Sequence, residues 1–309
     1  MSTPLYVMPQ TVAKAISLAN NDPAGYVFYA GGTDIQLHIK QHLIQPDTII
    51  DLTGVKSLKK INSRGGRLVL GAMVTLDQII HHQGIRANYP IIAVSATSVA
   101  TPVVRKTATL GGNLMVSNRC SFYNQSFEWR QSIGSCLKDT GDFCQVTGGL
   151  HHCYSRNVSD LAPALMALNA RVTVRSVTGK IYLPMAGLYV PDGLIVHAPL
   201  GAGGIITEIM IPEIPSKWWF KKLRLRNSMD FTSLTVAACV DNTDNLRVAV
   251  NGVSMAPVGV EAKISNLTLT DMIRQVKRTC KTVDNDYLPL QYRREMISAF
   301  LTECWESFH

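Results

Sequence analysis

Two short Gly-Gly segments are the residues of this chain best suited to hold a phosphate. One is Ala30-Gly31-Gly32-Thr33-Asp34, and the other is Thr109-Leu110-Gly111-Gly112-Asn113. Consecutive glycines let the backbone approach a ligand closely and turn successive N–H groups toward an anion. A tight turn explains either segment when it is taken alone. Neither segment is GxGxxG, and the chain has no GxxxxGKS or GxxxxGKT, so the sequence supports neither a Rossmann dinucleotide site nor a P-loop.

Four of the seven cysteines crowd into one segment and could hold a metal. They are Cys120, Cys136, Cys144 and Cys153, separated by 15, 7 and 8 residues. This spacing is neither the paired CxxC of a zinc ribbon nor ordinary ferredoxin ligation. Three interpretations stay open: a [4Fe–4S] cluster, a loose four-thiolate zinc site, or an insertion without a metal. His151 and His152 flank Cys153 and could compete as ligands, but exposed histidines beside a metal loop are the commoner case. The remaining Cys239, Cys280 and Cys304 have apolar neighbours and fit small buried hydrophobes.

The hydrophobic pattern predicts an α+β fold of three lobes that position these segments. The first lobe, residues 1–56, is a small β-α-β unit with the first Gly-Gly segment after its strand 26–30. The middle lobe, residues 57–176, is larger and α+β, and an inserted loop at about 114–158 carries the four cysteines. The third lobe, residues 177–309, is an antiparallel sheet with helices. Its expected elements are strands near 205–211, 220–225, 234–240 and 246–250, and helices at 271–278 and 290–305.

Composition restricts the class of protein and its partners. The chain has 309 residues, 46% of them hydrophobic, and a net charge of +8. The densest basic stretch, Lys217 to Arg226, alternates with apolar residues as in a half-buried strand, so we expect an acidic protein or a pyrophosphate as partner and no nucleic acid. The N-terminus lacks a secretory signal, and the longest weakly polar stretch, 91–104, is too short to span a bilayer. We therefore expect a cytoplasmic protein without a disulfide framework.

Taken together, the two Gly-Gly segments resemble the paired FAD loops of the medium, flavin-binding subunits of molybdenum hydroxylases, the xanthine dehydrogenase and carbon monoxide dehydrogenase family. The resemblance covers essentially the whole chain and includes Ser159 to Pro163 and Lys222 to Arg224 with Asp230. It implies that both loops hold the FAD diphosphate and ribityl, that Asp160 contacts the flavin side and that Lys222 lies near it. Tyr29 fits a strand-end core residue at least as well as a flavin contact. The cofactor-binding residues so implied are Phe28, Tyr29, Ala30, Gly31, Gly32, Thr33, Asp34, Ile35, Val99, Thr109, Leu110, Gly111, Gly112, Asn113, Asp160 and Lys222.

The cysteine segment looks very like that of the β subunits of 4-hydroxybenzoyl-CoA reductases, where an inserted loop holds an additional [4Fe–4S] cluster. The matching residues are Arg119 to Ser126, Trp129-Arg130, Cys136 to Lys138, Gly141-Asp142, Cys144 and Cys153-Tyr154. This resemblance implies that Cys120, Cys136, Cys144 and Cys153 are the cluster ligands. It also implies a large subunit with molybdopterin, a small subunit with two [2Fe–2S] clusters, a dimer of heterotrimers, and ferredoxin as electron donor.

The expected function is electron transfer through FAD and the cluster, within a larger enzyme. Asn113 and Cys120 are seven positions apart, so the chain between them spans at most roughly 25 Å and the two cofactors must be neighbours. The chain has no HExxH, nucleophile elbow or Cys–His signature, so we expect no catalysis on an organic substrate by this chain alone. Three alternatives remain: a hydroxylase flavin subunit that serves aldehyde or N-heterocycle oxidation, a non-redox FAD scaffold with a zinc or empty cysteine loop, and a free-standing flavin oxidase.

Overall fold

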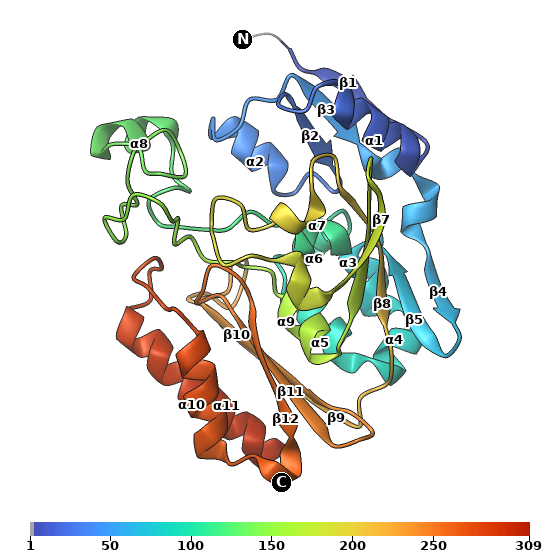
Figure 1. Ribbon diagram of the computed structural model, residues 1–309, viewed down its shortest axis with the longest axis vertical. Helices are drawn as coiled ribbons and strands as arrows, with labels where there is room; N and C mark the ends of the chain where they lie inside the picture. Colours follow the sequence, from blue (N-terminus) through green and yellow to red (C-terminus); the bar gives the residue numbers. More distant parts are fainter. Residues whose placement is uncertain (1–2) are drawn as a thin grey trace.

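The computed structural model describes residues 3–309, and its strands form three separate sheets (Figure 1). The N-terminal lobe consists of β1 (Leu5–Val7), α1 (Val12–Asn21), β2 (Tyr26–Tyr29), α2 (Ile35–Lys40) and β3 (Thr48–Asp51). Its strands are parallel in the order β1-β3-β2. The Thr11 hydroxyl accepts from the N–H of Lys14 and caps α1, whose apolar face packs on the sheet. The first Gly-Gly segment therefore leaves the carboxyl end of β2.

The middle sheet is antiparallel, in the order β4-β5-β8-β6-β7. Its strands are β4 (Ile61–Arg64), β5 (Arg67–Gly71), β6 (Arg171–Ser176), β7 (Gly179–Pro184) and β8 (Ile205–Ile211). The helices between β5 and β6 are α3 (Leu76–His81), α4 (Gln83–Asn88), α5 (Pro90–Thr97), α6 (Pro102–Arg105), α7 (Leu110–Leu114), α8 (Phe127–Ile133) and α9 (Leu161–Ala167). Apart from α8, they pack with the sheet around one core.

The sequence pattern starts the third lobe at residue 177, but that position is the turn of the β6–β7 hairpin. Because β7 and β8 both hydrogen-bond to β6, the middle sheet extends to Ile211. The strand expected at 205–211 is therefore present but belongs to the middle sheet. The division of the chain into lobes at 56 and 176 stays a prediction.

The C-terminal sheet is an antiparallel meander of β9 (Lys217–Leu223), β10 (Leu234–Val240), β11 (Asn245–Asn251) and β12 (Val258–Lys263). Helices α10 (Leu269–Thr279) and α11 (Leu290–Phe308) cover one face (Figure 1). Every residue of β10 is buried. Leu234 and Val236 face the two helices, while Ala237 faces the middle-lobe core. A strand covered on both faces reads as a continuous apolar run, as β10 does.

The α+β architecture expected from the sequence is confirmed. Short 3₁₀ helices complete it at Leu52–Gly54, Lys56–Lys59, Met185–Leu188, Ala198–Leu200 and Ile264–Asn266. Within residues 3–309, no helix combines the length and apolar character needed to cross a bilayer.

Candidate functional site

The first Gly-Gly segment lies directly against the chain that precedes the second. A Cβ on Gly31 would collide with the carbonyl of Thr107, so only glycine permits this approach. Gly32 has φ of +71°, a left-handed conformation that favours glycine. The structure thus brings the two predicted segments together.

Backbone donors at this junction are available to a ligand. Among residues 3–309, no acceptor is found for the N–H groups of Gly31, Gly32 and Thr33. Successive free N–H groups at the start of a helix form an anion-binding nest, which suits a diphosphate. The first segment therefore fits the phosphate end of a dinucleotide such as FAD.

The second segment is the beginning of helix α7 rather than an open loop. The Thr109 hydroxyl accepts from the N–H of Gly112 at 3.1 Å and caps the helix. A Cβ on Gly111 would crowd Ala72, so this glycine allows α7 to pack against the end of β5. The Asn113 side chain accepts from the Ser159 hydroxyl at 2.7 Å and from the N–H of Leu161 at 3.3 Å. Asn113 thereby fixes the start of α9, whose N-cap is Asp160.

Asp160 and Lys222 form a buried ion pair. Their Oδ2 and Nζ atoms are 2.7 Å apart, and each side chain is 5% exposed. The Lys222 ammonium also donates to the carbonyls of Ser98 at 3.0 Å and Asp230 at 3.1 Å. Burial raises the pKa of the Asp160 carboxyl, and Lys222 opposes that rise. Because Val99 follows Ser98, the fold brings together three of the predicted cofactor residues from three distant parts of the chain.

The aromatic residues at the end of β2 have different environments. The Tyr29 hydroxyl accepts from the Gln36 side chain at 2.9 Å, and its ring stands over Gly32. Phe28 packs against the N-terminal core and lies edge-on to the Tyr26 ring at 5.1 Å. Tyr29 therefore borders the candidate phosphate nest, whereas Phe28 serves the core.

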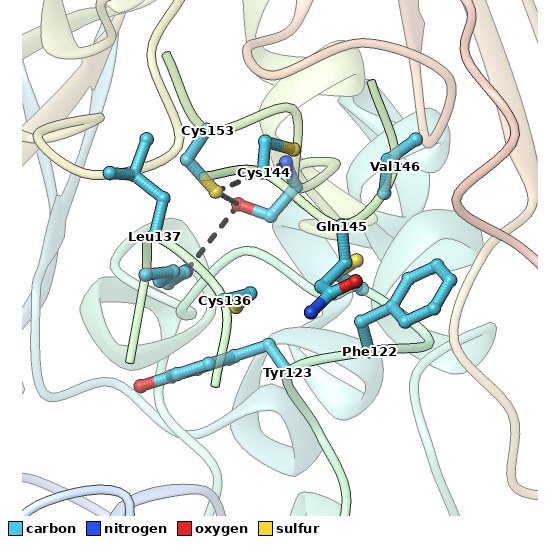
Figure 2. Close-up of a pocket in the computed structure, with 11 residues that line it drawn as sticks. Phe122, Tyr123, Cys136, Leu137, Cys144, Gln145, Val146 and Cys153 are labelled. Atoms are coloured by element: carbon cyan, nitrogen blue, oxygen red, sulfur yellow. Dashed lines mark hydrogen bonds between the residues drawn. The ribbon is translucent and has the colours of Figure 1, made fainter. Parts of the chain in front are cut away.

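The four clustered cysteines line one small cavity (Figure 2). All four are buried, and none forms a disulfide. The cavity has about 10 Å³ of free volume, room for about one water molecule. Its lining is Cys120, Phe122, Tyr123, Cys136, Leu137, Lys138, Cys144, Gln145, Val146, Cys153 and Ser155. In the part of the chain that the structure describes, no group of three or more His, Cys, Asp or Glu side chains is placed to hold a metal ion.

Backbone N–H groups donate to two of the four thiols, those of Cys144 and Cys153. The N–H of Ser155 donates to the Cys153 sulfur at 3.4 Å. Burial acts against ionisation of Cys144, but the N–H groups of Tyr154 and its other neighbours together lower the pKa of its thiol. Lys138 lines the same cavity, donates to the Asn118 carbonyl at 3.1 Å and is half-buried.

The Cys120 thiol is not ionised by its surroundings alone, because burial raises its pKa to about 11. A metal or cluster bound at this thiol would have to displace its proton. Two glycines allow the close approach of the segments that carry the cysteines. A Cβ on Gly141 would strike the Ser135 carbonyl, and one on Gly193 would crowd Ser155 and the Cys153 sulfur. Four buried thiols, with backbone N–H donors beside Cys144 and Cys153, have the chemistry of a four-thiolate donor set.

Two buried arginines in and beside the cysteine segment carry contacts that the sequence did not reveal. The Arg130 guanidinium pairs with Asp139 at 3.0 Å and donates to the carbonyls of Gln41 at 3.3 Å and Gln125 at 2.7 Å. It therefore holds the segment against the N-terminal lobe. Arg119 pairs with Asp34 of the first Gly-Gly segment. In the sequence, only the positions of Arg119 and Arg130 beside the cysteine motif pointed to these contacts.

Comparisons with known proteins agree with this geometry. A sequence family described as the FAD binding domain in molybdopterin dehydrogenase matches residues 1–214. The aldehyde oxidoreductase FAD-binding subunit PaoB of Escherichia coli K12 is 30% identical over 273 residues, which are 85% of each chain. The nicotine 6-hydroxylase medium subunit of Paenarthrobacter nicotinovorans is 26% identical over 251 residues, 80% of this chain and 74% of the relative.

Solved structures share the fold over nearly the whole chain. Carbon monoxide dehydrogenase from Hydrogenophaga pseudoflava, in a form that lacks the Mo-pyranopterin moiety, matches with a TM-score of 0.77 and 18% identity, over 99% of this chain and 97% of that chain. Reconstituted CO dehydrogenase from Oligotropha carboxidovorans matches with a TM-score of 0.78, 19% identity and the same coverage. Identities this low establish a common fold and nothing of the chemistry.

Proposed function

The chain belongs to the FAD-binding medium subunits of the molybdenum hydroxylase and xanthine dehydrogenase family, and from this membership we propose that it transfers electrons through FAD and a [4Fe–4S] cluster. The enzyme we propose resembles 4-hydroxybenzoyl-CoA reductase, with the cluster held by Cys120, Cys136, Cys144 and Cys153. The observation that carries the cluster is the meeting of all four thiols at one buried cavity.

The cavity between the four thiols is too small for a four-iron cluster as it stands. Binding of such a cluster would therefore require the thiols to move apart. Cys136 and Cys144 lie outside any helix or strand, in the irregular chain between α8 and α9, and the N–H of Cys144 donates to the Gly149 carbonyl at 2.8 Å. Zinc would instead require the thiols to close to about 2.3 Å around one ion.

The residues of the candidate flavin site have separate tasks in this scheme. When bound, FAD accepts and releases electrons, and the chain supplies its binding and orientation. The N–H groups of Gly31, Gly32 and Thr33 would hold the diphosphate. The Asp160 carboxylate would accept from the ribityl or the flavin ring while Lys222 keeps it in place. We propose that the remaining predicted residues also contact FAD. They are Ile35, Val99, Thr109, Leu110, Gly111, Gly112 and Asn113.

The proposed partners are those expected for a medium subunit of this family. We propose a large subunit that carries molybdopterin and the organic substrate, and a small subunit with [2Fe–2S] clusters, joined in a dimer of heterotrimers in the cytoplasm. Ferredoxin would deliver electrons to the cluster, and FAD would pass them toward molybdenum.

A second function of the same class has support from the relatives. The names of two of them are those of an aldehyde oxidoreductase and a nicotine hydroxylase. A hydroxylase that oxidises an aldehyde or an N-heterocycle would send electrons the other way, from molybdenum to an external acceptor. A non-redox FAD scaffold with zinc or nothing in its cysteine loop is the alternative of another class.

Low-temperature EPR with iron and zinc quantified on the same sample tests the proposal. We expect the anaerobically purified, dithionite-reduced chain to give a fast-relaxing [4Fe–4S]⁺ signal with about four irons per chain. Cys136→Ser and Cys144→Ser should lose the signal and the iron but keep FAD, and Cys280→Ser, outside the cavity, should keep both. Zinc in the wild-type chain, or no metal, would refute the cluster.

A further inference from the structure

Arg119 connects the first Gly-Gly segment to the cysteine cavity. Its guanidinium pairs with the carboxylate of Asp34 and donates to Nε2 of His38, both in or beside α2. Its main chain runs directly into Cys120, one of the four thiols of the cavity. One residue therefore contacts the candidate FAD loop and carries the chain to the candidate cluster.

The position of Arg119 is fixed from all three lobes. Its side chain is 8% exposed, and its guanidinium stacks on the Phe231 ring, 4.5 Å from the centroid, just before β10. Its backbone forms a pair of hydrogen bonds with Arg156, at 2.8 and 2.9 Å. Asp34 makes no capping bond at the start of α2; one oxygen of its carboxylate pairs with Arg119, and the other lies 3.7 Å from Nε2 of His38.

Charge at this place is balanced within the pair. Asp34 is 28% exposed and Arg119 is nearly buried, so water screens their charges only in part. At distances larger than their separation, the electrostatic potentials of the Asp34 carboxylate and the Arg119 guanidinium nearly cancel. Either charge alone would change the reduction potential of a nearby redox group, because reduction adds negative charge to that group.

We propose that Arg119 is a positioning residue that ties the FAD loop to the cluster loop and, with Asp34, sets the electrostatic potential at both cofactors. This inference rests on the proposed function, since it requires FAD and iron in the chain. It makes a prediction about sign: loss of Arg119 leaves the Asp34 carboxylate uncompensated and makes reduction harder. Loss of the Asp34 charge leaves the Arg119 guanidinium uncompensated and makes reduction easier.

Redox titration of the FAD absorbance and of the cluster EPR signal tests this prediction on the purified chain. We expect Arg119→Met to shift both midpoint potentials to more negative values and Asp34→Asn to shift them to more positive values. At a fixed potential the reduced-to-oxidised ratio should change on the order of tenfold in each case. Arg119→Lys keeps the charge and should stay near wild type. Arg274→Met removes an arginine that pairs with Asp271 on the surface, where the side chains are 72% and 43% exposed, and should shift neither potential.

The outcomes separate this inference from the proposed function. Wild-type protein without FAD or iron would refute the proposed function. Wild-type protein with FAD but no iron would leave the flavin potential as the readout. If Arg119→Met does not fold, the test is the comparison of Asp34→Asn, which should shift the midpoint potentials to more positive values, with Arg119→Lys, which should not shift them. Shifts of the same sign in Arg119→Met and Asp34→Asn, or no shift in folded variants that hold their cofactors, would overturn the inference.

Discussion

The ion pair between Lys222 and Asp160 is buried, so it affects the stability of the chain more than a surface ion pair does. The pair joins β9 to the first turn of α9, and the Asp160 carboxylate also accepts from Thr235 at 3.3 Å. Each charge depends on the other, because a buried charge without its partner is strongly unfavourable. The resemblance to known flavin subunits indicated both residues, but only the fold shows that they bind each other.

Removal of Lys222 should therefore destabilise the chain itself. We expect Lys222→Met to lower the free energy of unfolding by about 3–5 kcal/mol, because it leaves the Asp160 carboxylate buried and uncompensated. The neighbouring Lys221 pairs with Glu303 at the surface, with side chains 44% and 47% exposed, so Lys221→Met should cost about 1 kcal/mol or less. Urea unfolding of both variants measures the difference. Equal losses would show that the Lys222 pair contributes no more than a surface contact.

At the scale of elements, hydrophobic patterning predicted the buried strands and long helices well. The strands expected at 234–240 and 205–211 have the observed bounds, and the helix expected from residue 290 begins there. These elements bury large apolar faces, and a buried apolar face is visible in the sequence as a periodic pattern or run of hydrophobic residues. Strand β7 was not predicted, because it is an exposed edge strand without apolar alternation.

The expectation of a second loop at 109–113 was wrong about its conformation. Two glycines disfavour a helix by about 1 kcal/mol each relative to alanine. The Thr109 cap and the packing of Gly111 on Ala72 outweigh that preference, and α7 forms. Tertiary contacts of this kind, like the partners of Arg119 and Arg130, depend on residues far apart in the sequence and leave no local pattern.

The junction of the two Gly-Gly segments gives a prediction at the same scale. Gly31→Ala should separate the segments, because the new Cβ would overlap the Thr107 carbonyl, a backbone atom that cannot move aside cheaply. We expect the affinity for FAD to fall about tenfold or more, measured by titration of the apoprotein with FAD. Gly84→Ala in α4 meets only the side chain of His82 at 3.3 Å and should leave the affinity unchanged. Wild-type affinity in Gly31→Ala would mean that the junction does not form the FAD site.

At the scale of the whole molecule, buried asparagines join the middle lobe to the C-terminal sheet. Asn157 donates to Asn118 at 3.1 Å and accepts from Asn251 of β11 at 2.8 Å. Asn118 also donates to the carbonyl of Met255, beyond β11, at 2.7 Å. A buried network of this kind requires most of its polar groups to be satisfied at once, so it holds the lobes in one arrangement. The candidate FAD and cysteine sites, which draw residues from different lobes, depend on that arrangement.

The net charge of +8 bears on the direction of electron flow. If an acidic ferredoxin reduces the chain, long-range attraction should speed the encounter at low salt and fade as the Debye length shrinks. We expect the second-order rate of FAD reduction by reduced ferredoxin, followed by stopped flow, to fall at least about tenfold between 0.01 and 0.2 M salt. Cys136→Ser should lose the fast reduction at every salt concentration, since electrons would enter through the cluster. Fast reduction in that variant would place the entry point at the flavin, and the absence of any ferredoxin reaction in wild type would favour a hydroxylase that delivers electrons outward.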